Sequence, residues 1–137
     1  MAKILYVDAD GDRTESVRRL LAGMGHLVIV ARSAERAMIR VDQESDFDAV
    51  LLHLILPGMD GAELCRWLER WSRLARVPRV VFTGPETRLS LGLEDRLPPW
   101  LPADQYLHCV SDFERIAGAV QSVLSPPENG RAGRRPN

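Results

Sequence analysis

Cysteines, long apolar runs and an excess of charge of one sign are scarce or absent in this sequence of 137 residues, and each scarcity excludes a class of protein. The two cysteines, Cys65 and Cys109, have no CxxC spacing, so no disulfide framework is expected and a reducing cytosol is indicated. No stretch reaches the roughly 18 apolar residues that a membrane span needs. The apolar run at the N-terminus is too short for a signal peptide. We expect a cytoplasmic protein without membrane contact.

The formal net charge is only −1, so no global charge indicates binding to nucleic acid or to a membrane surface. The composition is 45% hydrophobic and 27% charged, which is typical of a globular domain with one core. We expect one domain over residues 1–124. The segment 125–137 carries three arginines and has the composition of a disordered basic tail, which we interpret as a solvated end.

Segments typical of strands and of helices alternate five times along the chain. Short apolar runs predict strands over Lys3–Val7, His26–Ala31, Asp48–His53, Arg79–Thr83 and Gln105–Val110, and the first of them suits a strand buried on both faces. Capping residues and apolar spacing predict helices that begin near Asp12, Ser33, Glu86 and Ser111. A further helix follows the third strand, with one face marked by Leu64, Trp67, Leu68 and Trp71. The segment 84–102 is expected to be irregular, because Gly92 weakens the helix at 86–93 and Pro98 and Pro99 must end it.

This alternation predicts an α/β doubly wound fold, in which parallel strands are joined by right-handed helical crossovers on both faces of one sheet. In such a sheet the site forms outside the carboxyl ends of the strands. The residues at these ends are therefore the candidates for chemistry. They are Asp8, Ala9 and Asp10 after the first strand, His53, Thr83 and Cys109.

Four segments in this order resemble the response-regulator receiver domain, the phosphoacceptor module of bacterial two-component signalling. They are "ILYVDAD", "DAVLLHLILPGMDG", "VPRVVFTG" and "DQYLHCVSDFERI". The resemblance covers roughly Ala2–Leu124. It implies a flavodoxin-like (βα)5 fold with a five-stranded parallel sheet of order 2-1-3-4-5.

The family resemblance also implies a mechanism. An aspartate at the end of the third strand accepts a phosphoryl group, and two acids after the first strand hold Mg²⁺. A Thr or Ser and a Lys then contact the phosphoryl oxygens and bias a surface made by the fourth helix, the fifth strand and the last helix. Here Asp8 matches one acid and Asp10 follows in the next place, while Thr83 and Tyr106 match the two switch residues.

Three positions depart from the family pattern. His53 stands at the position of the nucleophilic aspartate, Cys109 at that of the lysine, and Ala9 takes one acid of the pair. An imidazole cannot form an acyl phosphate, a cysteine gives no stable cation for phosphate, and the loss of a carboxylate weakens a Mg²⁺ site. We therefore expect a pseudo-receiver without catalytic residues or cofactor, which is not an enzyme. It would act by protein–protein recognition through the surface around Tyr106.

Several alternatives remain open at this stage. His53 could be protonated beside Asp8 and Asp10 and fix one switch state, or it could be a buried polar residue satisfied by Asp8 or by backbone. The domain could instead respond to pH or to a transition metal through Asp8, Asp10 and His53; His108 and Cys109, as neighbours on a strand, should point to opposite faces. A conventional receiver with a non-standard acceptor is a further alternative. A homodimer through the last helix is also compatible with the sequence.

Overall fold

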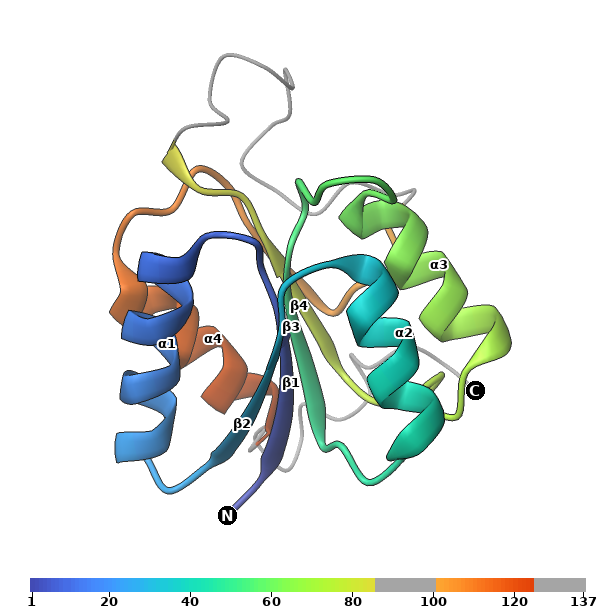
Figure 1. The fold of residues 1–137 in the computed structure, drawn as a ribbon. Coiled ribbons are helices and arrows are strands. Elements are labelled where there is room, and N and C mark those ends of the chain that lie inside the picture. The colour runs from blue at the N-terminus through green and yellow to red at the C-terminus, as the bar shows by residue number, and fades with distance from the viewer. Residues whose placement is uncertain (86–100, 125–137) are drawn as a thin grey trace.

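A computed structural model describes residues 1–85 and 101–124 of the chain. Strands and helices alternate along it, as Figure 1 shows. The elements are β1 (Lys3–Val7), α1 (Gly11–Gly23), β2 (Leu27–Ala31), α2 (Ala34–Gln43), β3 (Ala49–His53), α3 (Gly61–Trp71), β4 (Arg79–Phe82), β5 (Gln105–Leu107) and α4 (Phe113–Leu124). The helix predicted at 86–93 and the tail 125–137 lie outside the described residues.

The five strands form one parallel sheet of order β2-β1-β3-β4-β5. Helices α1 and α4 cover one face of the sheet, and α2 and α3 cover the other (Figure 1). The flavodoxin-like fold and the strand order expected from the sequence are therefore confirmed, with four helices in the part of the chain that is described.

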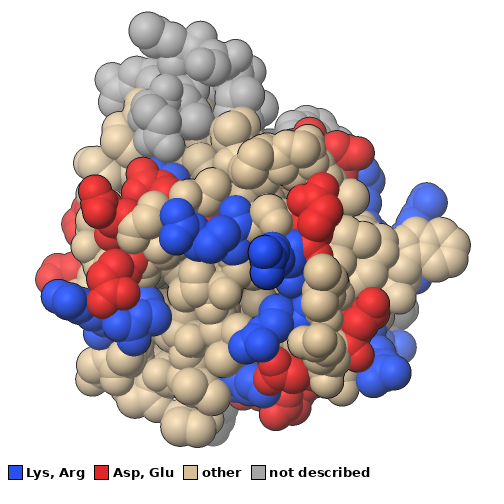
Figure 2. All heavy atoms as spheres, in the orientation of Figure 1, with Lys and Arg blue, Asp and Glu red and all other residues tan. Residues whose placement is uncertain are grey.

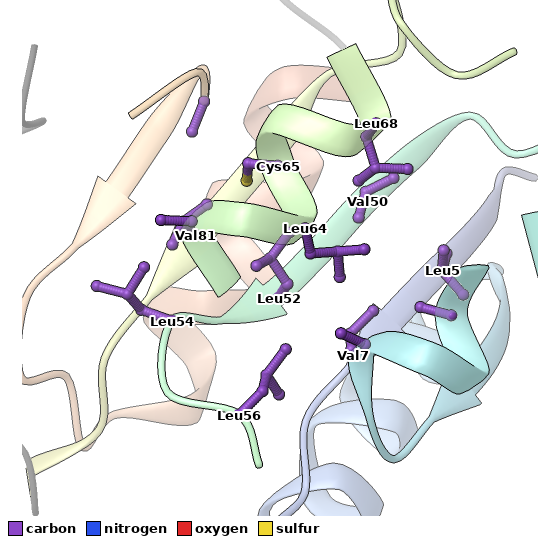
Figure 3. Packing of buried hydrophobic residues seen from close by; sticks show 14 of the residues in the cluster. Leu5, Val7, Val50, Leu52, Leu54, Leu56, Leu64, Cys65, Leu68 and Val81 are labelled. Carbon is purple, nitrogen blue, oxygen red and sulfur yellow. The ribbon is translucent and has the colours of Figure 1, made fainter. Parts of the chain in front are cut away.

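Two apolar clusters lie on opposite faces of the sheet because successive side chains of a strand point in opposite directions. In β1, Leu5 and Val7 join the cluster under α2 and α3, whereas Ile4 and Tyr6 join the cluster under α1 and α4. Figure 3 shows the first cluster, in which Leu64 of α3 packs against the sheet. Burial of each large aliphatic side chain contributes about 1.5–3 kcal/mol, so both clusters hold the helices on the sheet.

Two helix starts differ from the prediction. Helix α1 begins at Gly11 and not near Asp12. The reason is that the Asp10 side chain caps it by accepting a hydrogen bond from the backbone N–H of Arg13. Before α4 it is Asp112, and not Ser111, whose side chain accepts from the backbone N–H of Glu114. In both cases the carboxylate of a neighbouring aspartate accepts the backbone hydrogen bond that was expected for the predicted capping residue.

Strand β5 is shorter than predicted because it ends at Leu107 instead of Val110. Cys109 has a φ of 50°, in the left-handed region that a non-glycine residue rarely adopts and that no extended strand allows. The chain therefore leaves the sheet just before His108 and Cys109, which has consequences for the site.

Basic side chains gather locally although the net charge is small. A groove of about 710 Å³ lies between β2 and α2. Its lining includes Arg32, Arg36 and Arg40, together with the apolar Ile39. Figure 2 shows blue side chains over these elements, with acidic side chains beside them. Within residues 1–85 and 101–124, no helix has the length and apolarity needed to cross a membrane.

Candidate functional site

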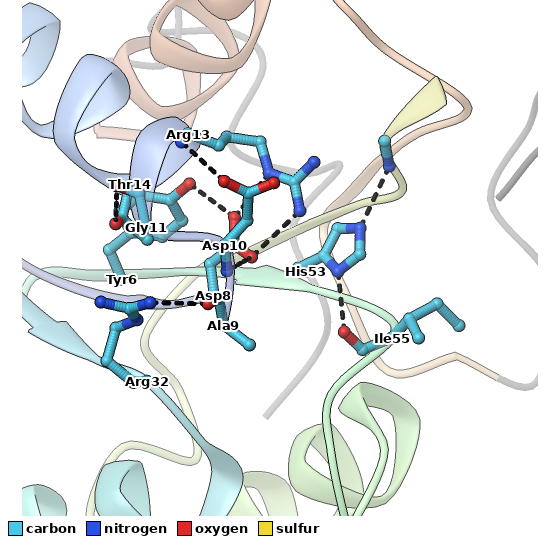
Figure 4. Close-up of polar contacts among 11 residues, drawn as sticks. Tyr6, Asp8, Ala9, Asp10, Gly11, Arg13, Thr14, Arg32, His53 and Ile55 are labelled. Atoms are coloured by element: carbon cyan, nitrogen blue, oxygen red, sulfur yellow. Dashed lines mark hydrogen bonds and ion pairs between the residues drawn. The ribbon is translucent and has the colours of Figure 1, made fainter. Parts of the chain in front are cut away.

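The residues expected to carry chemistry meet at the carboxyl end of the sheet. Val7 pairs with Leu52 and His53 pairs with Phe82 in the strand register, so Asp8, His53 and Thr83 end neighbouring strands. Figure 4 shows the Asp8 side chain turned toward α1 and the His53 ring on the adjoining strand. The topology thus brings the predicted positions together.

The centre of the site is a buried ion pair between Asp8 and Arg13. The Arg13 Nε lies 2.7 Å from Asp8 Oδ2, and its Nη2 lies 3.0 Å from Oδ1, so the guanidinium donates to both carboxylate oxygens. Asp8 is completely buried and Arg13 is 6% exposed. The guanidinium also lies over the ring of Phe82, 5.3 Å from its centroid. Figure 4 shows this bidentate contact.

Two further donors complete the surroundings of the Asp8 carboxylate. The Tyr6 hydroxyl donates to Oδ2 at 2.9 Å, and the backbone N–H of Asp10 donates to Oδ1 at 3.1 Å. Burial, reinforced by the charge of Asp8, holds the pKa of Tyr6 well above its usual range. Tyr6 therefore stays protonated and remains a donor to the carboxylate.

The other two residues after β1 have structural roles. Asp10 is exposed and caps α1, and the hydrogen bond from the backbone N–H of Arg13 lowers the pKa of its carboxyl. Ala9 offers no carboxylate, and its carbonyl oxygen accepts a hydrogen bond from Arg32 Nη2 at 2.7 Å. One acid position of the family is thus replaced by a backbone carbonyl that binds an arginine.

His53 is buried, with 3% of its surface exposed, and both of its ring nitrogens bind backbone groups. Nε2 accepts from the N–H of Gly84 at 3.1 Å, and Nδ1 lies 2.8 Å from the carbonyl oxygen of Ile55. An acceptor at Nε2 requires the neutral ring with its proton on Nδ1. The cation beside Asp8 is Arg13, and the His53 ring binds backbone groups, so the geometry favours the alternative of a buried polar residue satisfied by backbone.

The loop after β3 is closed by the start of α3. A Cβ at Gly61 would lie 2.8 Å from the carbonyl oxygen of His53, so only glycine allows the helix to approach this closely. Asp60 caps α3 and forms a capping box with Glu63, and the N–H of Gly61 donates to Leu54. Asp60 is therefore engaged in the helix start, which the sequence analysis did not predict.

A second polar network joins the ends of β4 and β5. The Thr83 hydroxyl accepts from the backbone N–H of Cys109 at 2.7 Å and lies 3.4 Å from the Tyr106 hydroxyl. The Tyr106 hydroxyl lies 2.9 Å from His108 Nδ1, and Cys109 Sγ lies 3.3 Å from His108 Nε2. The expectation that His108 and Cys109 point to opposite faces is wrong, because both residues lie beyond the end of β5.

The residues at the acidic end do not fit a Mg²⁺ ion. Magnesium needs an octahedral set of oxygen ligands, whereas both oxygens of Asp8 bind the Arg13 guanidinium and Ala9 provides no carboxylate. The described residues also contain no group of three or more His, Cys, Asp or Glu side chains that could hold a metal.

Arg13 is the residue of this candidate site that the sequence did not predict. A signal for it exists, because helical side chains lean toward the N-terminus of their helix. An arginine in the first turn of α1 therefore points back to the end of β1, where Asp8 lies. This deduction needs the correct start of the helix.

Comparisons with known proteins agree with this architecture. The family described as "Response regulator receiver domain" matches residues 4–91. Transcriptional regulatory protein TcrA of Mycobacterium tuberculosis is 33% identical over 121 residues, which cover 88% of this chain and 45% of TcrA. Transcriptional regulatory protein CpxR of Escherichia coli is 31% identical over 124 residues, covering 90% of this chain and 50% of CpxR. The chain thus spans about half the length of these relatives.

Solved structures share the fold at lower sequence identity. The chemotaxis response regulator CheY4 of Vibrio cholerae has a TM-score of 0.72 at 24% identity, with 90% of this chain and 99% of that chain covered. A Francisella response regulator receiver domain has a TM-score of 0.74 at 17% identity, with 90% and 97% covered. These similarities show a common sheet and helix arrangement.

Proposed function

This chain belongs to the response regulator receiver family, and we propose that it is a signalling domain that works without an aspartyl phosphate. It acts in the cytoplasm by binding a protein partner and carries out no catalysis. The observation that carries the proposal is the bidentate contact of Arg13 with Asp8, which supplies a positive charge where the family resemblance implies a metal.

The energetics of this pair oppose metal binding. A guanidinium is charged at every physiological pH, so it neutralises Asp8 permanently. Mg²⁺ could reach the carboxylate only after Arg13 had left a site in which both partners are almost fully buried. Separating the members of a buried ion pair costs about 3–5 kcal/mol. The free energy of metal binding would have to exceed the cost of separating this ion pair, although Ala9 removes one of the carboxylates that the family pattern provides.

The acceptor position supports the same proposal. Phosphoryl transfer to His53 would need the lone pair of Nε2, which already accepts the N–H of Gly84. Transfer to Nδ1 would disrupt the hydrogen bond to Ile55. Both nitrogens of the ring thus serve to hold the end of β3 against the neighbouring loops, which is a structural use of the residue.

The proposed partner surface includes β5 and α4, which is the last helix in the part of the chain that is described. The fourth helix that the family resemblance adds to this surface was predicted at 86–93, outside the described residues. Tyr106 lies on β5 and is 8% exposed; its side chain joins the cluster under α2 and α3, and its hydroxyl lies 2.9 Å from His108 Nδ1, where the chain leaves the sheet. Phe113 and Leu124 at the two ends of α4 are only partly buried against the core. These partly exposed side chains are available to the core of a protein contact, where aromatic residues such as Phe113 are enriched.

Beryllofluoride, which mimics a phosphoryl group on aspartate, provides the test. Two-dimensional amide NMR spectra are recorded before and after addition of Mg²⁺ and beryllofluoride. We expect the resonances of Asp8, His53, Thr83 and Tyr106 to stay unchanged in the wild-type protein. Concerted shifts of these resonances would overturn the proposal.

A matched control restores the family pattern in the same chain. It combines Ala9→Asp, Arg13→Ala, His53→Asp and Cys109→Lys. In this variant we expect the same addition to shift resonances at the ends of β1, β3 and β4. The pair of spectra then attributes the inert pocket to these four positions.

A further inference from the structure

The segment after β5 places a thiol against an imidazole. Cys109 Sγ lies 3.3 Å from His108 Nε2, and both residues are only partly buried, so a small solute can reach them. The other ring nitrogen, Nδ1, lies 2.9 Å from the Tyr106 hydroxyl. A nucleophile, a base within reach and a third group that orients the base form an arrangement typical of an activated cysteine.

The backbone holds the thiol in this position. Cys109 has a φ of 50°, and its N–H donates to the Thr83 hydroxyl at 2.7 Å. Adjacent side chains in a strand would diverge, whereas this turn brings the Cys109 and His108 side chains to the same side. The pairing is thus built by contacts from two strand ends, and not by an exposed cysteine alone.

We propose that Cys109 is a reactive thiol, with His108 as its base, that is oxidised by solutes of the peroxide class. The S–H proton moves to His108 Nε2, and the imidazolium then donates from Nδ1 to the Tyr106 oxygen and from Nε2 to the thiolate. Thiolate and imidazolium stabilise each other as in other Cys–His pairs.

The oxidation step balances without another reactant. The thiolate sulfur attacks one oxygen of hydrogen peroxide, a new S–O bond forms and the O–O bond breaks. The leaving hydroxide takes the proton from the His108 imidazolium and becomes water. The sulfur is oxidised to a sulfenic acid while the peroxide is reduced.

His108 is the base that the geometry places beside the thiol. Among residues 1–85 and 101–124, the other contacts of His108 and Cys109 come from the hydroxyls of Tyr106 on β5 and Thr83 after β4, which carry no charge at neutral pH. The added oxygen would enter the network that joins Thr83 and Tyr106. Reactivity of this thiol does not depend on whether the pocket at Asp8 accepts a phosphoryl group.

The first test is alkylation by iodoacetamide, followed by mass mapping of the two cysteine peptides as a function of pH. Cys65 is the internal control, because it is completely buried in α3. We expect Cys109 to react much faster than Cys65. Its rate at about pH 6.5 should be about tenfold higher in the wild type than in His108→Gln.

The wild-type pH profile decides the question even if the His108→Gln protein does not fold. A rate that stays high down to about pH 6.5 supports the pair, whereas a tenfold fall per pH unit below about 8.5, as for a free thiol, overturns it. Tyr106→Phe should lower the rate by a smaller factor, since it removes only the group that orients the base.

The second test treats the protein with hydrogen peroxide in the presence of dimedone, which captures sulfenic acids. We expect the dimedone adduct on the Cys109 peptide of the wild type, and strongly reduced capture in His108→Gln. Fast alkylation without any dimedone adduct would overturn the oxidation step. Equal capture on Cys65 and Cys109 would overturn the assignment to this site.

Discussion

The stability of the protein depends on the presence of both members of the buried ion pair, Asp8 and Arg13. Replacing Arg13 by Met leaves the fully buried Asp8 carboxylate without its cation, although Tyr6 still donates to it. We expect a loss of about 3–5 kcal/mol in the free energy of unfolding. Urea denaturation followed by circular dichroism measures this loss.

The control for this substitution is Arg18→Met on the same helix. Arg18 pairs with Glu15, but both side chains are exposed, at 40% and 48%. Exposed pairs contribute little to stability, so the unfolding midpoint should hardly move. Equal effects of the two substitutions would contradict the role given to the buried pair.

The tautomer of His53 is a second prediction for a single residue. Because Nε2 accepts from Gly84 and Nδ1 donates to Ile55, the ring should carry its proton on Nδ1 at neutral pH. Long-range nitrogen–proton NMR spectra of the imidazole distinguish this tautomer from the others. A spectrum of the doubly protonated ring at pH 7 would contradict the hydrogen-bond assignment.

The sequence predicted that the strand-end residues of the site lie together, but not which contacts connect them. Asp8, His53 and Thr83 could be placed together because they end neighbouring parallel strands. The role of Arg13 could not be predicted, since it depends on α1 beginning at Gly11 and on a side chain reaching back across the turn. The approach of Cys109 to His108 depends on a positive φ, which no residue type at that position indicates.

At the scale of elements, the start of α1 depends on one capping side chain. Asp10→Ala removes the acceptor for the Arg13 backbone N–H, and such a loss costs about 1 kcal/mol at neutral pH. The pKa of Asp10 is lowered in the folded state, so its contribution is present above the unfolded value of about 3.9 and is lost as the pH falls through the lower folded value.

Chemical denaturation of the wild type and Asp10→Ala at a series of pH values tests this dependence. The difference between the two proteins should be constant near neutrality and should shrink at acid pH. A difference that persists after Asp10 has been protonated would show that the carboxylate form does not matter to the cap.

Strands were easier to predict than helix ends. A parallel strand buried on both faces needs a continuous apolar run, and the run itself marks Lys3–Val7. Helix starts are ambiguous where several acids compete for one cap, as Asp10 and Asp12 do. Which acid caps the helix depends on the direction in which the chain leaves the preceding strand, and this direction is set by the tertiary structure.

At the scale of the whole molecule, stability rests on the two apolar clusters that hold helices against the sheet. Leu64→Ala in α3 removes a completely buried side chain from the first cluster and should cost about 2–5 kcal/mol. Trp71→Ala lies on the same helix, but this tryptophan is 74% exposed, so its replacement should change the free energy of unfolding by less than about 0.5 kcal/mol. Thermal unfolding of both variants provides the comparison, and similar losses would contradict the packing described for α3.

The guanidinium that neutralises Asp8 is covalently part of the chain, and this changes how the domain relates to its surroundings. A bound metal is present in proportion to its free concentration, whereas Arg13 accompanies Asp8 at a fixed one-to-one stoichiometry. Excess EDTA or millimolar Mg²⁺ should therefore leave the melting temperature unchanged, and a rise with Mg²⁺ would contradict this view. On this view the positive charge beside Asp8 comes from the Arg13 side chain, and it does not vary with the concentration of metal ions.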